Sequence, residues 1–125
     1  DPEKGGRAVM TTALFTHPAC LGHDNGPGHP ERPDRLRVVL RALESEVFAT
    51  LAREEAPEAT VEQLARAHPE RYVAAILSIA VPDGERVMLD PDTGMSSGSR
   101  AAALRSAGGA VAAVDAVMQG WAAAD

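Results

Sequence analysis

One strand-like stretch stands at the start of a chain whose other apolar residues are spaced as in helices. Residues 12–17, TALFTH, alternate partly and carry threonine and phenylalanine, which favours a strand. Residues 54–60 are an extended connector or a short strand, because Pro57 excludes a helix there. A strand is not stable alone. We therefore expect the remaining strands of its sheet to lie outside this chain.

The clearest amphipathic pattern covers residues 34–48. Its apolar positions, three or four residues apart, are Leu36, Val39, Leu40, Leu43 and Val47. Pro33 suits the first turn of a helix, where its missing N–H costs nothing. Asp34 places a negative charge near the helix N-terminus, which is favourable. The preceding residues, 18–32, are rich in glycine and proline and are predicted to be a loop.

The rest of the chain is also predicted to be mainly helical. Thr60 and Gln63 have the spacing of a capping box, which predicts a short helix from residue 61. His68-Pro69 ends that helix and begins another. The later elements are a turn at 82–85, a long polar loop at 88–99 and a helix at 100–119 with Ser97 or Ser99 as its cap.

Gly108 and Gly109 lie inside the last predicted helix. Each glycine there costs about 1 kcal/mol relative to alanine. A cost of this size predicts that the backbone of a neighbouring segment approaches the helix closely at this point. The same small residues would also permit another helix to approach.

Charge and composition narrow the possible partners. The chain carries 12 lysine and arginine residues against 18 aspartate and glutamate residues, a formal net charge of −6. It has no basic run of the kind that binds nucleic acid or an anionic membrane. Its longest apolar runs, Ala74–Leu77 and Ala110–Val114, are much shorter than a bilayer requires. We expect neither a nucleic-acid nor a membrane partner.

The cysteine content and the N-terminal sequence bear on localisation. Cys20 is the single cysteine, so an intramolecular disulfide is impossible and a reducing, cytoplasmic setting is expected. The start, DPEKGGRAVM, lacks the apolar core of a signal peptide. We expect residues 1–9 to be an expression-derived or upstream tail and residues 10–125 to carry the fold.

Several groups with metal-binding or nucleophilic chemistry gather near the predicted loop. They are His17, Cys20, Asp24, His23 and His29. The histidines and the cysteine are possible zinc ligands, but their spacing matches no well-defined zinc finger. Cys20 could also pair with a histidine as a nucleophile. The alternatives are solvated or hydrogen-bonded histidines and a small buried cysteine.

Asp90 and Asp92 form a carboxylate pair in the segment LDPDT. Two residues apart on an extended backbone, their side chains would point the same way. They could then hold a cation or accept hydrogen bonds from the N–H groups of a substrate. The simpler alternative is a pair of solvated turn aspartates.

Four motifs together resemble the histone deacetylase-like family, which includes acetoin-utilisation proteins and acetylpolyamine amidohydrolases. They are GHPERPDRL (28–36), LARAHPERYV (64–73), LDPDTGMSSGS (89–99) and RSAGGAVAAVDAVMQG (105–120). The resemblance implies an α/β fold with an eight-stranded parallel sheet, shared with arginases. It also implies zinc-dependent hydrolysis of acetylated lysine or acetylated amines. This chain would be the N-terminal third, helix-dominated with one or two short strands.

The resemblance also implies roles for single residues. Arg35 matches an arginine that lines an internal product channel for acetate. Asp92 matches the rim aspartate that accepts hydrogen bonds from the substrate backbone, with Asp90 as the alternative. The zinc ligands of the family, a D-x-H pair and a later aspartate, and its RPPGHH-like histidine pair are absent. Residues 10–125 would then end before the catalytic centre, with no catalytic residue, zinc only in the full-length protein, and no activity alone.

Two other function classes remain open. The chain could be a non-catalytic oligomerisation or interaction module. It could also be a small hydrolase whose site is built from the cysteine and histidines of the loop region. If the chain is a deacetylase fragment or an interaction module, another surface must cover its apolar helix faces. We therefore expect a homo-oligomer, most simply a dimer, or pairing with the remainder of the parent domain. The side chains expected to be partly exposed are Leu36, Leu40, Leu43, Val111, Val114 and Met118.

Overall fold

The computed structural model describes residues 11–122 of the chain, with side chains described as far as residue 120. The tail expected at residues 1–9 lies outside the described residues. The elements are β1 (Ala13–Thr16), η1 (Pro18–Gly22), α1 (Pro33–Ala42), η2 (Glu46–Phe48), β2 (Ala52–Glu55), α2 (Val61–Ala65), α3 (Glu70–Leu77), β3 (Val87–Asp90), β4 (Thr93–Met95) and α4 (Ser99–Ala122). The α/β class, dominated by helices, is confirmed.

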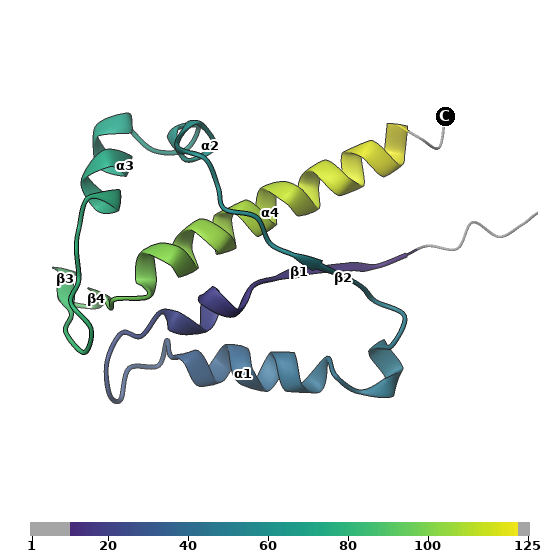
Figure 1. Ribbon diagram of the computed structural model, residues 1–125, viewed down its shortest axis with the longest axis horizontal. Coiled ribbons are helices and arrows are strands. Elements are labelled where there is room, and N and C mark those ends of the chain that lie inside the picture. Colours follow the sequence, from purple (N-terminus) through teal and green to yellow (C-terminus); the bar gives the residue numbers. More distant parts are fainter. Residues whose placement is uncertain (1–10, 123–125) are drawn as a thin grey trace, which may run out of the picture.

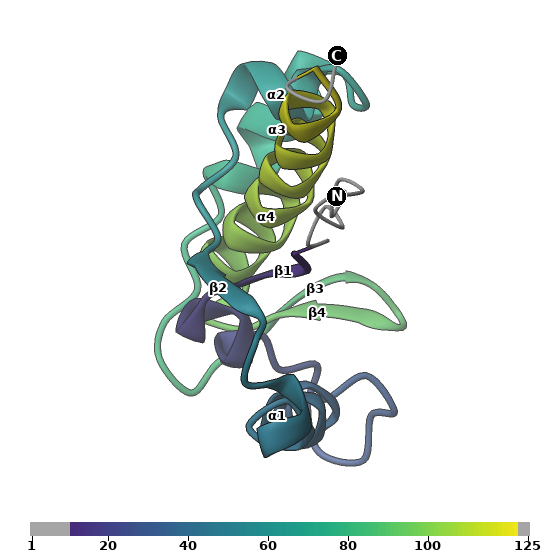
Figure 2. The ribbon, with the colours of Figure 1, turned by 90° about the vertical axis from the view of Figure 1, so that its right-hand side faces the viewer.

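The two strands β1 and β2 pair in parallel at the centre of the molecule, with α1 on one side and α4 on the other (Figures 1 and 2). Ala13 lies opposite Ala52, and Thr16 lies opposite Glu55. The pairing continues where the Ala56 N–H donates to the Thr16 carbonyl over 2.8 Å. The expectation that the first strand has no partner within the chain is therefore wrong. The predicted connector or short strand at 54–60 overlaps β2 in its first two residues, Glu54 and Glu55.

The first helix is shorter than its apolar pattern predicts. α1 begins at Pro33, as expected, but ends at Ala42, and residues 46–48 form a separate 3-10 turn. Ser45 between them has an extended conformation. The Arg53 side chain, from β2, donates to the carbonyl of Leu43 just beyond the helix end. A cation that satisfies the last carbonyls stabilises an early end of the helix.

The predicted loop at 88–99 contains a β-hairpin instead. β3 and β4 pair antiparallel, with Val87 opposite Met95 and a register shift between Met88 and Asp90. The prediction missed the hairpin because each strand is short and little alternation is visible. The Asp90-Pro91-Asp92 sequence does carry turn chemistry, since proline and aspartate both favour tight turns.

The capping box and the turn were predicted correctly. The Gln63 N–H donates to Thr60 Oγ1 over 3.1 Å, and the Thr60 N–H donates to Gln63 Oε1 over 2.9 Å. α3 starts after Pro69, as expected. The Glu85 N–H closes the predicted turn by donating to the Pro82 carbonyl over 3.1 Å.

The close approach predicted at the glycine pair of α4 is confirmed. A Cβ atom on Gly108 would lie 1.9 Å from the Pro57 carbonyl oxygen, and one on Gly109 would lie 3.0 Å from the Ala56 Cβ. The segment is held there by the Ala59 N–H, which donates to the Leu104 carbonyl over 2.9 Å. The connector after β2 therefore covers the glycine surface. That surface is not available for helix pairing between copies.

The core formed by the described residues is thin. Its buried apolar side chains are Ala56, Ala59, Val73, Met95 and Ala102. Several larger apolar side chains face solvent instead, among them Val38 and Val47 on or after α1 and Val114, Val117 and Met118 on α4. As expected, Leu36, Leu40, Leu43 and Val111 are half-buried. Much of the apolar surface of the helices is thus uncovered.

α4 is long and apolar enough, by length and composition, to cross a membrane, and it is the one such helix among the described residues. The prediction from uninterrupted apolar runs did not identify this helix, because its many alanine and glycine residues keep α4 apolar over its whole length. One helix of this kind is weak evidence for a membrane-spanning segment, since the core helices of other proteins meet the same criterion. Here the first half of α4 packs against η1 and β1, which favours a structural role.

Candidate functional site

An open cavity of about 490 Å³ lies between the 23–32 loop, α3, the β3–β4 hairpin and the start of α4. Its lining is mainly apolar, from side chains such as Leu36, Ile76 and Leu89. The polar groups in the lining include His23, Glu31, Thr93 and Ser99. Of the residues singled out from the sequence, Cys20, His23 and Ser99 line the cavity. Asp92 directly precedes the lining residue Thr93, and His29 lies two residues before the lining residue Glu31, so we call their surroundings the rim of the candidate site.

His23 contacts Ser99 and Asn25 inside the molecule. Its Nδ1 lies 2.7 Å from Ser99 Oγ, and its Nε2 lies 3.0 Å from the side-chain nitrogen of Asn25. The Asn25 amide orientation is set by Gly94, whose N–H donates to Oδ1 over 3.0 Å. Asn25 therefore donates to Nε2, so the neutral ring carries its proton on Nδ1 and donates to Ser99.

This direction of donation rules out a conventional nucleophilic pair. In such a pair the serine hydroxyl donates to an unprotonated ring nitrogen, which then removes its proton. Here the Ser99 oxygen accepts from the ring and also from the Ser96 N–H, over 2.8 Å. His23 and Ser99 therefore form a structural contact between the loop and α4.

Ser96 continues the same hydrogen-bond network. Its hydroxyl donates to the Gly22 carbonyl over 3.0 Å and accepts from the Asp24 N–H over 3.1 Å. The backbones also meet, because a Cβ atom on Gly98 would lie 2.4 Å from the Gly22 oxygen. Neither predicted serine acts as a simple helix cap: α4 begins at Ser99, which is buried in this network.

His29 and Asp92 meet at the exposed rim of the site. His29 Nε2 lies 3.0 Å from both the carbonyl oxygen and Oδ1 of Asp92. Desolvation of the ring lowers the pKa of His29, but the hydrogen bonds and the charge of Asp92 outweigh it, so the pKa lies above its usual value. The Asp92 side chain is 92% exposed, whereas that of His29 is 20% exposed. The Asp92 carboxylate thus faces solvent, whereas the His29 ring that holds it is largely shielded.

Asp90 has a different environment although it lies only two residues away. Its carboxylate accepts the Asp92 N–H over 2.7 Å and the Thr93 hydroxyl over 3.1 Å. These two hydrogen bonds hold the pKa of the Asp90 carboxyl below its usual value. Asp90 is therefore occupied in closing the hairpin turn. The backbone turns between the two carboxylates, which agrees with the alternative of two turn aspartates rather than a pair on an extended segment.

Arg35 lies in the first turn of α1 and forms an ion pair with Glu31. The Arg35 side chain is 64% exposed, while Glu31 lines the cavity. A guanidinium is suited to bind a carboxylate, and in this structure the carboxylate that it binds is that of Glu31. The role of Arg35 in a product channel stays a prediction.

The cysteine and histidines of the sequence are not brought together. The contacts differ for each: His17 with Glu55, Cys20 with the Ala102 carbonyl, His23 with Ser99, Asp24 with Arg86, and His29 with Asp92. Across residues 11–122, no three His, Cys, Asp or Glu side chains are grouped so that they could hold a metal ion. The geometry offers no support for a hydrolase site built from this set.

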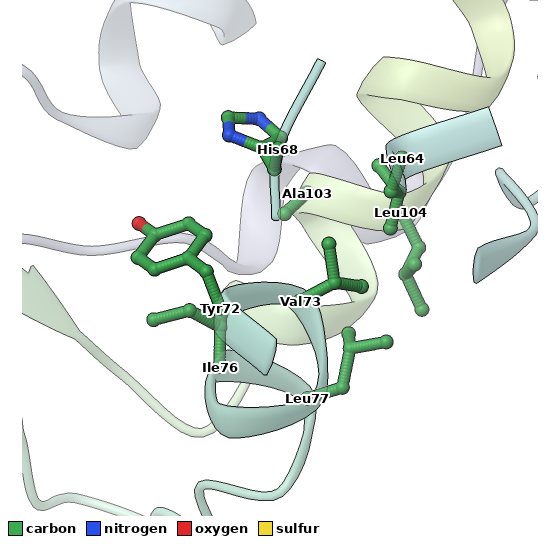
Figure 3. A pocket seen from close by; sticks show the side chains of 8 residues that line it. All are labelled: Leu64, His68, Tyr72, Val73, Ile76, Leu77, Ala103 and Leu104. Atoms are coloured by element: carbon green, nitrogen blue, oxygen red, sulfur yellow. The ribbon is translucent and has the colours of Figure 1, made fainter. Parts of the chain in front are cut away.

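A separate apolar pocket of about 150 Å³ lies between α2, α3 and α4 (Figure 3). The rings of His68 and Tyr72 lie on one side of it, with centroids 5.5 Å apart and a tilt of 37°. Val73, Leu64 and Leu104 supply apolar side chains. His68 and Tyr72 are the polar side chains in a lining that is otherwise apolar, so the pocket offers packing surface and no arrangement for acid–base chemistry.

Sequence reasoning found Asp92 and His29 separately but missed their contact. It also missed Asn25 and Ser96, which orient the groups around His23. Asn25 is only two residues from His23, but the contacts His29–Asp92, Asn25–Gly94 and His23–Ser99 join residues 63 to 76 apart, so no local pattern reveals them. The turn residues around Asp90 were the one local sign that the 88–99 segment is ordered.

Comparison with known proteins gives consistent matches. Residues 29–125, most of the chain, match the model of the histone deacetylase domain. A "Probable deacetylase" of Archaeoglobus fulgidus is 32% identical over 112 residues, which cover 87% of this chain and 30% of the relative. A "Histone deacetylase-like amidohydrolase" of Pseudomonas aeruginosa is 33% identical over 127 residues, covering 87% of this chain and 33% of the relative.

The chain thus spans about a third of the length of these curated relatives. The family match covers three of the four motifs in full and the first from His29 onward, and the matches together confirm the resemblance. The chain belongs to the histone deacetylase family.

Proposed function

We propose that the chain is the N-terminal segment of a zinc-dependent amidohydrolase that removes acetyl groups from acetylated lysine or acetylated amines. In this proposal the segment supplies the substrate rim and has no activity by itself. The observation that carries it is the Asp92 carboxylate, exposed at the rim and held by His29 beside a cavity of about 490 Å³. The matched relatives are named as deacetylase and amidohydrolase, which supports the same reaction class.

The residues of this chain do not fit the zinc of the family. The D-x-H pair is absent from the sequence, and residues 11–122 contain no cluster of three suitable ligands. We therefore derive no catalytic step through a metal within this chain. In the proposed full-length protein, zinc and its ligands come from residues other than these.

The rim role is assigned to Asp92 rather than Asp90. A carboxylate oxygen that accepts substrate N–H groups must be free and exposed, and charge-assisted hydrogen bonds of this type are strong. The Asp90 oxygens already accept two hydrogen bonds within the turn. Arg35 is proposed to guide the acetate product, supported by the fit of a guanidinium to a carboxylate and by its place next to the lining residue Leu36.

The test uses the full-length protein that contains this segment, assayed on acetyl-lysine peptides and acetylated amines. Turnover that a chelator abolishes is the expected result, whereas the 125-residue chain alone should show none. Asp92→Ala should lower kcat/KM about tenfold or more, the size expected when a charge-assisted hydrogen bond is lost. Asp90→Ala should lower it less. The opposite ranking would contradict the assignment, and chelator-sensitive turnover by the short chain would contradict the proposal itself.

A second candidate, association, is favoured by the exposed apolar side chains. Val114 and Val117 on α4 are 61% and 69% exposed, and Val38 on α1 is 65% exposed. Val114 and Val117 lie three residues apart, on one face of α4, and monomers rarely leave large apolar patches uncovered. We propose that these faces pair with a second copy or with the remainder of the parent domain, in the cytoplasm. Sedimentation at micromolar concentration tests it, since a stable monomer with cooperative unfolding would exclude pairing between copies.

A further inference from the structure

The rim contact between the 23–32 loop and the β3–β4 turn carries an inference that rests on the proposed function. We propose that His29 is a positioning residue for Asp92. It holds the carbonyl and one carboxylate oxygen of Asp92, so that the other carboxylate oxygen is presented to the substrate. His29 itself does not touch the reacting atoms.

The hydrogen bonds of His29 determine which of its ring nitrogens carries the proton. The Glu31 N–H donates to His29 Nδ1 over 3.0 Å, so the neutral ring carries its proton on Nε2. That Nε2–H is shared between the two Asp92 oxygens, each 3.0 Å away. The backbone of His29 is anchored as well, because its N–H donates to the Gly26 carbonyl over 3.3 Å. His29 is therefore a fixed donor.

Asp92 is held from its other side by the turn. Its N–H donates to Asp90 Oδ1 over 2.7 Å, so both of its backbone polar groups are engaged. Oδ1 is taken by His29. Within residues 11–122, no protein group donates to Oδ2 in the structure, and the side chain is 92% exposed. One carboxylate oxygen is thus left to accept a hydrogen bond from outside.

The charges around the ring are consistent with this role. The Glu31 carboxylate is paired with Arg35, and the Asp90 carboxylate is engaged in the turn, so Asp92 is the acidic side chain that contacts the ring. Because a flexible, 92% exposed aspartate would lose conformational freedom on gripping a substrate, holding it beforehand reduces that cost. The predicted consequence is weaker substrate binding when the donor is removed, with the chemical step unchanged.

The first experiment uses the 125-residue chain and needs no substrate. NMR of the ring nitrogens should show His29 in the Nε2–H tautomer, and 15N relaxation should show Asp92 as ordered as its neighbours in the hairpin. His29→Phe keeps an aromatic ring without the donor and should increase fast motion at Asp92. His29→Gln keeps a side-chain N–H donor and should restore order. His68→Phe, a histidine outside the rim, is the matched control and should leave Asp92 unchanged.

The second experiment uses the full-length protein and an acetyl-lysine peptide. His29→Phe should raise KM about tenfold, the size expected for loss of a hydrogen bond to a charged group, without a comparable fall in kcat. His29→Gln should bring KM back toward that of the unaltered protein. In an Asp92→Ala background, His29→Phe should have no further effect, because a positioning residue acts only through the group it positions.

The outcomes separate the inference from the proposed function. An Nδ1–H tautomer, or unchanged order at Asp92 in His29→Phe, would overturn the positioning role whatever the activity. An additive effect of His29→Phe on the Asp92→Ala background would overturn it too, because His29 would then act independently. A full-length protein without acetyl hydrolysis would overturn the proposed function alone, since the tautomer and relaxation results do not depend on turnover.

Discussion

The two halves of α4 are both rich in alanine, but they have opposite environments. In the first half, Ser99 and Ala102 are 5% and 6% exposed, and the glycine pair lies under the connector after β2. In the second half, Val117 and Met118 are 69% and 62% exposed. The ribbon shows the second half of α4 running away from the β1–β2 pair (Figure 1). Neighbouring segments, rather than helix composition, therefore decide where substitutions in α4 should matter.

The largest effect is expected at the glycine pair. Gly108→Ala would place a Cβ atom 1.9 Å from the Pro57 carbonyl oxygen, which belongs to backbone and cannot rotate away. We expect the free energy of unfolding to fall by about 3 kcal/mol, since overpacking outweighs the gain in helix propensity.

The matched control lies in the other half of the helix. Gly120 has no atom within 4 Å of a Cβ position, so Gly120→Ala should stabilise by about 0.5–1 kcal/mol through helix propensity. Urea unfolding followed by circular dichroism measures both variants. Equal effects of the two substitutions would mean that the connector does not press on α4.

A smaller loss is expected for Ser99→Ala at the start of the helix. This change removes the acceptor of the His23 ring and of the Ser96 N–H, and both groups are part-buried. Leaving such groups unpaired costs about 1–3 kcal/mol. Ser97→Ala, at an exposed neighbouring position, should change stability by less than about 0.5 kcal/mol. A thermal melt of both variants that showed no difference would contradict the structural role of the network.

The exposed rim should show a weaker, pH-dependent effect. The pKa of His29 is raised in the folded state by Asp92, so the contact stabilises most below the unfolded value of about 6.5. The stabilisation is lost as pH rises through the raised pKa. Asp92→Asn should therefore lower Tm more at pH 5 than at pH 9. A constant difference at the two pH values would show that the charge on Asp92 is not what raises the pKa.

The smallest effect on folding is expected in the exposed half of α4. Val117→Lys should change monomer stability by less than about 0.5 kcal/mol, because its side chain contacts mainly solvent. The same substitution should reduce association if this face pairs with a second copy. Sedimentation velocity beside an unfolding curve separates the two effects. A large loss of stability at unchanged molecular mass would mean that this half of α4 is packed in solution.

Local patterns predict much of the fold but little of the site. The glycine pair predicts a close approach at Gly108, although not that the partner is Pro57. The capping box of Thr60 and the start of α1 at Pro33 follow from backbone rules that act within a few residues. The early end of α1 does not, because the Arg53 side chain that contacts the Leu43 carbonyl comes from β2. Likewise, the family membership follows from motifs, whereas the different environments of Asp90 and Asp92 follow from the turn between them.

The sequence alone determined the helix-dominated class, the starts of α1, α2 and α3, and the need for a close backbone approach at the glycine pair, because propensity, capping and the small size of glycine are local properties. The tertiary structure decided that β1 pairs with β2, that His23 is an internal donor and that His29 is a rim donor. These outcomes depend on partners such as Ser99 and Asp92, which lie 76 and 63 residues from their histidines. A histidine has the same chemistry at both positions, and the partner that reaches each ring nitrogen determines which proton it carries and what it can hold.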